Sequence, residues 1–370
     1  MIASAHTELG SGDIARMSTF LNGYPIFPPA PPANSPGSIE SAASPRFKAP
    51  GGRTTALATS NVDYAKVKMV DPIDKIAFIK FRADPLRPGS LTFEVRRPDD
   101  LTTVASRAGY LPIWWLPWSS RRIVKLKINR ATESGANGTA SFNPAGIAPL
   151  PNPNLFFTAA INGCSVFAVG DPREPSVYHG GIDGQLDSPE SSNLSAADFQ
   201  ALGGTSEAVW RNLLDGYRAN AGAAVRANPA APLKSAGASF GEINRSDYVA
   251  ERKADGSLYQ SNYAGSMVKT TSAALRLEKY LKGKRTLTGV SVSPWGCVAG
   301  LRDTTGNWTF HLLRNATITY KRVSYDNKFG LIVWGRQETP SCVSDNLGQL
   351  QFFPARGAAH YRAFSTIQLT

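Results

Sequence analysis

The feature that most restricts the fold of this chain is the order of its periodic segments. Runs of apolar and β-branched residues typical of strands occupy 62–69, 75–82, 90–96, 123–129, 155–161 and 165–169. Helical spacing follows at 196–202, 206–221 and 272–281, and strand patterning returns at 286–292, 309–313, 316–323 and 331–334. This order lacks regular βαβ alternation and argues against a Rossmann fold or a TIM barrel. We therefore expect an α+β architecture in which helices flank a mixed or antiparallel β core.

The first part of the chain has a different composition. Residues 24–52 are rich in Pro, Ala, Ser and Gly, which is typical of an extended tether without a core of its own. We interpret residues 1–55 as a flexible leader and residues 56–370 as one folded domain.

Charge and cysteine content limit the partners, compartment and cofactors that we expect for this protein. The 370 residues carry a formal net charge of +12, which favours acidic partners, but no nucleic-acid motif accompanies the scattered Arg and Lys. Nucleic acid is thus not an expected obligate partner. The N-terminus lacks a Sec-type signal pattern, and no apolar run is long enough to span a membrane. The three cysteines indicate free thiols in a reducing compartment, with no expected metal, zinc or nucleotide cofactor.

The chain offers three Cys–His pairs for nucleophilic catalysis, which needs a base close to the thiol. Cys164 follows the turn dipeptide Asn162-Gly163, where backbone N–H groups can form an oxyanion hole, and His179 follows fifteen residues later, before two glycines. We read 170–175 as the loop of a hairpin that brings the two together. The alternatives are Cys297 with His311 and Cys342 with His360, and spacing alone also permits Cys164 to be a small buried residue in a strand.

The segment from Leu155 to Ala168, LFFTAAINGCSVFA, closely resembles the active-site segment of the glutamine deamidase toxins typified by Burkholderia lethal factor 1. Those toxins are related to the catalytic domain of the cytotoxic necrotizing factors. The stretches 88–95 and 115–118 are similar to the same toxins in the same order, with a weaker similarity at 330–337. Asn162 stands where the family usually has Ser, and the Cys-to-His spacing is slightly longer than in the lethal factor.

The resemblance implies a β-sandwich-like core of mixed sheets flanked by helices, with insertions around 185–285. It implies Cys164 as the nucleophile, His179 as its base and Thr158 as the third member, the Thr158 hydroxyl holding the imidazole. Asn162 and Gly163 would bind the oxyanion and the substrate. The resemblance also implies a monomeric effector, secreted or injected without a Sec-type signal, that deamidates a host protein in the host cytoplasm. The candidate targets are a translation-initiation RNA helicase and a Rho-family GTPase.

Two other functions stay open on the sequence alone. A cysteine protease or acyltransferase would use the same Cys164–His179 pair, because these reactions differ from deamidation in the bond cleaved or in the acceptor that meets the thioester. A basic binding protein without enzymatic activity would need neither residue to be accessible.

Overall fold

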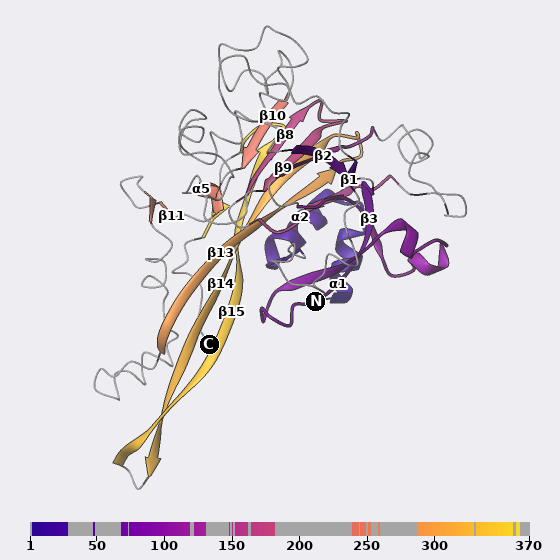
Figure 1. Cartoon of the computed structure of the whole chain (residues 1–370). Helices are drawn as coiled ribbons and strands as arrows, with labels where there is room; N and C mark the ends of the chain where they lie inside the picture. The colour runs from indigo at the N-terminus through magenta and orange to yellow at the C-terminus, as the bar shows by residue number, and fades with distance from the viewer. Residues whose placement is uncertain are drawn as a thin grey trace.

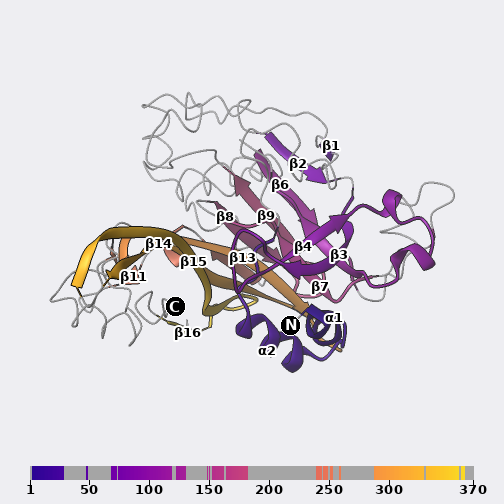
Figure 2. The ribbon, with the colours of Figure 1, turned by 90° about the horizontal axis from the view of Figure 1, so that it is seen from below.

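The structure is a computed structural model of the chain, and it is mostly β (Figure 1). It describes residues 2–28, 47–48, 68–72, 74–118, 122–130, 148, 150, 152–161, 164–181, 239–243, 245–248, 251–252, 258–259, 287–328, 331–357 and 360–362. Two large sheets pack against each other, and two N-terminal helices cover the outer face of the larger sheet (Figure 2).

The larger sheet is built from β3 (Ile76–Ala83), β4 (Leu91–Arg96), β5 (Leu111–Leu116), β7 (Leu155–Thr158), β13 (Leu287–Arg302), β14 (Trp308–Lys328), β15 (Leu331–Phe353) and β16 (His360–Tyr361). The strand order is β16-β15-β14-β13-β7-β5-β3-β4. All neighbours are antiparallel except β5 and β7, which are parallel. Strands β13, β14 and β15 are much longer than the rest and extend from the body as an arm (Figure 1).

The smaller sheet contains β1 (Phe47–Lys48), β2 (Lys68–Pro72), β6 (Arg122–Lys127), β8 (Ser165–Gly170), β9 (Ser176–Gly181) and β10 (Ser239–Ile243). Its order is β1-β2-β6-β9-β8-β10, with β2 and β6 parallel. A short helix, α5 (Arg245–Tyr248), follows β10, and β11 (Glu251–Arg252) pairs with β12 (Leu258–Tyr259). Two 3-10 turns, η3 (Pro98–Asp100) and η4 (Ala105–Arg107), lie between β4 and β5.

Side-chain alternation along the strands of the larger sheet creates two cores. Successive side chains of a strand point to opposite faces. Trp114 and Phe156 thus enter a core shared with Val124 and Val166 of the smaller sheet. The next residues, Trp115 and Phe157, belong to a second core on the other face. Since both faces of the larger sheet are buried around β5 and β7, these two strands are nearly continuous apolar runs.

The helices that cover the second core are α1 (Ile2–Leu9) and α2 (Ile14–Gly23) (Figure 2). The Asp13 carboxylate caps α2 by accepting hydrogen bonds from the backbone N–H groups of Ala15 and Arg16. Met17, Phe20 and Leu21 recur at helical spacing and are buried in that core.

The prediction of a flexible leader over 1–55 is therefore wrong for residues 2–28. The Pro-rich composition begins only after α2, and the apolar face of α2 buries surface that the larger sheet alone would leave exposed. Residues 29–46 and 49–55 of the predicted leader lie outside the described residues.

The predicted strands at 75–82, 90–96, 123–129 and 165–169 are confirmed within one or two residues as β3, β4, β6 and β8. The predicted strands at 286–292 and 331–334 are confirmed as parts of the longer β13 and β15, whereas those at 309–313 and 316–323 are one continuous strand, β14. In the first predicted strand, only residues 68 and 69 are described, as the start of β2. The three predicted helices at 196–202, 206–221 and 272–281 lie outside the described residues, as does most of the predicted insertion at 185–285.

Candidate active site

A tight hairpin connects the segment that carries Cys164 to the strand that carries His179. Strands β8 and β9 are antiparallel neighbours joined by residues 171–175, so the predicted hairpin is confirmed. Gly170 has a φ of +110°, which suits glycine at the start of the turn. The Asp171 carboxylate accepts a hydrogen bond from the backbone N–H of Arg173, and the Pro172 carbonyl accepts one from Trp308 of the other sheet. The turn is thus fixed to both sheets.

The register of this hairpin places Cys164 and His179 on one face. Val166 lies directly opposite His179, and Ser165 lies opposite Gly180. Since side chains alternate, Cys164 shares the face of Val166 and is a diagonal neighbour of His179. This face points into the core between the sheets, where Cys164 and Val166 are both buried.

His179 is enclosed on this face. His179 has 0% exposure. Its β9 position pairs with Val166 of β8 on one side and with Val124 of β6 on the other. Neither ring nitrogen has a hydrogen-bond partner among the residues that the structure describes. Burial lowers the pKa of His179 from 6.5 to about 3, because the charged imidazolium loses its hydration. The imidazole is therefore neutral at neutral pH and has a lone pair available to accept a proton.

Thr158 reaches the same interior from the opposite sheet. It ends β7, and the alternation of that strand puts it on the face of Phe156, toward the smaller sheet. The structure does not form the expected hydrogen bond from Thr158 to His179. Instead, the Thr158 hydroxyl oxygen accepts a hydrogen bond from the backbone N–H of Val298 at 3.0 Å. Thr158 therefore joins β7 to β13 and has one hydroxyl proton left to donate.

The backbone is held at Ile161 and at Cys164. Ile161 and Gly296 exchange backbone hydrogen bonds of 2.7 and 2.9 Å. The Tyr248 hydroxyl donates a hydrogen bond of 2.9 Å to the Cys164 carbonyl oxygen. Asn162 and Gly163, predicted to bind the oxyanion, lie outside the described residues. Sequence reasoning missed Tyr248, since no local pattern connects residues 84 positions apart.

Cys297 and His311 also lie diagonally on one face, because Cys297 pairs with Leu313 and Ala299 with His311. However, the Cys297 thiol donates to the Ile26 carbonyl oxygen at 3.6 Å, and burial raises the pKa of this thiol. Burial lowers the pKa of His311 to about 4. A fully buried thiol that donates to a carbonyl is held in its protonated form, which disfavours this pair as the catalytic one.

Cys342 and His360 are separated along the larger sheet. Cys342 pairs with Thr319, whereas His360 pairs with Gln349, seven residues further along β15. At about 3.3 Å per residue, the two positions are about 20 Å apart. Cys342 instead lines a cavity of about 360 Å³ together with Arg87 and Trp295. The structure thus removes this pair from the candidates.

Within the described ranges, no three His, Cys, Asp or Glu side chains gather as a metal site would require. No helix there has the length and apolar character to cross a membrane.

Comparison of the sequence with known families and with curated proteins gave no match in either case.

Proposed function

We propose that this protein is a thiol enzyme that deamidates a glutamine side chain of another protein, with Cys164 as nucleophile and His179 as base. The observation that carries the proposal is the hairpin register, which makes the two side chains diagonal neighbours on one face. Thr158 faces the same interior from the opposite sheet. Three residues that the resemblance to the deamidase toxins selects are thus directed to one region, although they come from three strands or turns.

The proposed reaction begins with transfer of the Cys164 thiol proton to the neutral His179 imidazole. The thiolate attacks the carboxamide carbon, and the imidazolium returns the proton to the departing ammonia. Water, deprotonated by His179, then hydrolyses the thioester and releases a glutamate side chain. The balance is one water consumed and one ammonia released, with one new negative charge on the target.

Burial of the site has opposing effects on this reaction. Alone, an imidazole with a pKa of about 3 is a poor proton acceptor. The same water-excluded surroundings strengthen the attraction between a thiolate and an imidazolium, so forming the ion pair offsets part of that cost. Among the described residues the His179 ring nitrogens have no hydrogen-bond partner, so the proposed reaction requires the Cys164 and His179 side chains to approach each other.

The proposed substrate is a host protein, with a translation-initiation RNA helicase or a Rho-family GTPase as the candidate classes. The net charge of +12 favours a target with an acidic surface. The proposal includes a monomeric effector, secreted or injected without a Sec-type signal, that acts in the host cytoplasm. A fold of the necrotizing-factor type is part of the same proposal, supported by the two packed mixed sheets.

A second candidate is a basic binding protein in which Cys164 and His179 are core residues. The observation that favours it is the complete burial of His179, whose ring has no hydrogen-bond partner within the described part of the chain. The two candidates differ in whether the Cys164 thiol is required for any effect of the protein.

The deciding experiment expresses the wild type, Cys164→Ala and Cys297→Ala in eukaryotic cells. Cys297→Ala is the matched control, because it also removes a buried thiol near the core. Proteome-wide mass spectrometry then searches for glutamine-to-glutamate conversion, a gain of about one dalton, and for new peptide termini. We expect conversion with the wild type and Cys297→Ala but not with Cys164→Ala. Equal effects of all three proteins would overturn the enzyme proposal, and new termini in place of conversion would indicate a protease.

A further inference from the structure

Tyr248 is the last residue of α5 and lies in the core between the sheets. Its side chain has 0% exposure and belongs to the same hydrophobic cluster as Cys164. The Tyr248 hydroxyl donates a hydrogen bond of 2.9 Å to the Cys164 carbonyl oxygen. A residue far along the chain is thus bonded to the main chain of the proposed nucleophile.

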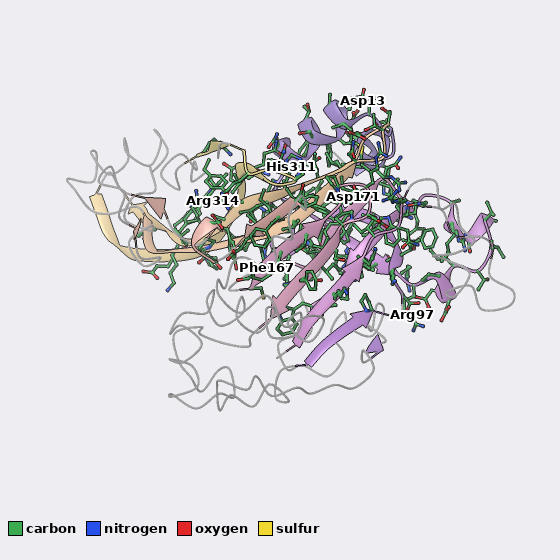
Figure 3. The ribbon with its side chains drawn as sticks, turned by 90° about the horizontal axis from the view of Figure 1, so that it is seen from above. Asp13, Arg97, Phe167, Asp171, His311 and Arg314 are labelled. Carbon is green, nitrogen blue, oxygen red and sulfur yellow. The ribbon has the colours of Figure 1, made fainter. Side chains whose placement is uncertain are left out.

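Two arginines from the C-terminal strands and the loop after them hold α5 in place. A helix of four residues has too few internal hydrogen bonds to be stable alone. The Arg314 Nε, on β14 (Figure 3), donates to the Tyr248 carbonyl oxygen at 3.4 Å, and the Arg314 side chain is itself buried. Arg356 forms an ion pair with Asp247 and donates to the Glu242 carbonyl oxygen at 3.0 Å. The Tyr248 hydroxyl is therefore presented to Cys164 by a tethered element.

The hydrogen bond acts on the peptide plane that joins Cys164 to Ser165. Rotation of this plane turns the Cα–Cβ bond of Cys164 and moves the sulfur relative to His179. Ser165 starts β8 and is fixed by the sheet, so the Cys164 carbonyl is the first main-chain acceptor before the paired strand.

We propose that Tyr248 is a positioning residue that directs the Cys164 thiol toward His179, an inference that rests on the proposed function of this pair. The hydrogen bond of the Tyr248 hydroxyl is to the Cys164 main chain, so Tyr248 acts on the position of the thiol. Loss of its hydroxyl lets the Cys164 carbonyl rotate, so fewer molecules hold the sulfur beside the imidazole.

The test uses Tyr248→Phe, which removes only the hydroxyl, with Tyr320→Phe as the matched control. Tyr320 is also buried, but it lies six residues beyond Arg314 on β14. Alkylation of the full chain by iodoacetamide is followed across pH, with peptide mass spectrometry to resolve Cys164 from Cys342. This readout needs no knowledge of the substrate.

For Tyr248→Phe, we expect Cys164 alkylation to slow by about tenfold, the rate equivalent of one lost hydrogen bond. The inflection in the pH dependence of Cys164 alkylation should move toward the pKa of an ordinary thiol, because the thiolate no longer lies beside His179. Tyr320→Phe should match the wild type in rate and in pH profile.

An unchanged rate and pH profile in Tyr248→Phe, with a reactive Cys164 in the wild type, would overturn the positioning role alone. A wild-type Cys164 no more reactive than Cys342 would overturn the proposed nucleophile itself. If Tyr248→Phe does not fold, Arg356→Gln is used in its place, because it removes the ion pair that holds Asp247 of α5. Slower Cys164 alkylation in that variant supports the inference, and an unchanged rate contradicts it.

Discussion

The Cys297 thiol donates its hydrogen to the Ile26 carbonyl oxygen at 3.6 Å, which connects β13 to the segment that follows α2. This contact explains why one of two geometrically similar Cys–His pairs is unsuited to catalysis. Both pairs are diagonal neighbours across an antiparallel hairpin. The Cys297 thiol is held by a main-chain acceptor, and burial raises its pKa.

Cys297→Ala should leave deamidation within about twofold of the wild type and lower stability by about 1 kcal/mol, a typical effect of one buried substitution. Iodoacetamide labelling of the folded wild type should modify Cys297 last of the three cysteines, because it is fully buried. Faster labelling of Cys297 than of Cys164, measured by peptide mass spectrometry, would contradict the assignment of the nucleophile.

Thr158→Val should destabilise the protein by about 1–3 kcal/mol, the cost of a buried N–H group left without an acceptor. This group is the Val298 backbone N–H, which donates its hydrogen bond to the Thr158 hydroxyl oxygen. Thr158→Ser retains the acceptor and is the control. Urea unfolding of the three proteins measures the difference, and equal stability of the Val and Ser variants would show that this hydrogen bond contributes little.

His179 should make stability depend on pH. Its pKa is about 3 in the folded protein and near 6.5 when unfolded, so below pH 6.5 the unfolded state binds a proton that the folded state does not. Stability is therefore complete above about pH 6.5 and falls progressively toward pH 3. His179→Phe should lose less stability than the wild type across this window in urea titrations. Parallel curves for the two proteins would mean that His179 is hydrated in solution.

Met17→Ala should cost about 2–5 kcal/mol, as expected for truncating a large buried side chain. Met17 lies on the buried face of α2 and has 0% exposure, whereas Thr19 on the same helix is exposed. Thr19→Ala is the control and should change stability by less than about 0.5 kcal/mol. Thermal unfolding of both variants tests whether the N-terminal helices belong to the cooperative fold. If Met17→Ala left the stability unchanged, this segment would instead be a leader outside the cooperative fold.

The short strands were predictable because apolar and β-branched residues run through or alternate along the segments of Phe78 and Val95, as expected for strands of a buried sheet. The N-terminal helices were missed although Asp13, followed by Met17, Phe20 and Leu21, is a capped amphipathic pattern. The neighbouring Pro-rich composition outweighed that pattern. The hairpin of Cys164 and His179 followed from local turn chemistry. Tyr248 did not, since its contact with Cys164 depends on how distant segments pack.

The hydrogen bonds from the Asn346 side-chain amide to the Leu21 and Tyr24 carbonyl oxygens have a consequence for how the chain is made. The donor is 325 residues later in the sequence than Leu21, so α2 leaves the ribosome long before this partner exists. Contacts between such distant residues form slowly, because a very long loop must close first. During synthesis, the apolar face of α2 must therefore wait uncovered, which makes the nascent N-terminus a natural target for chaperones until the final strands emerge.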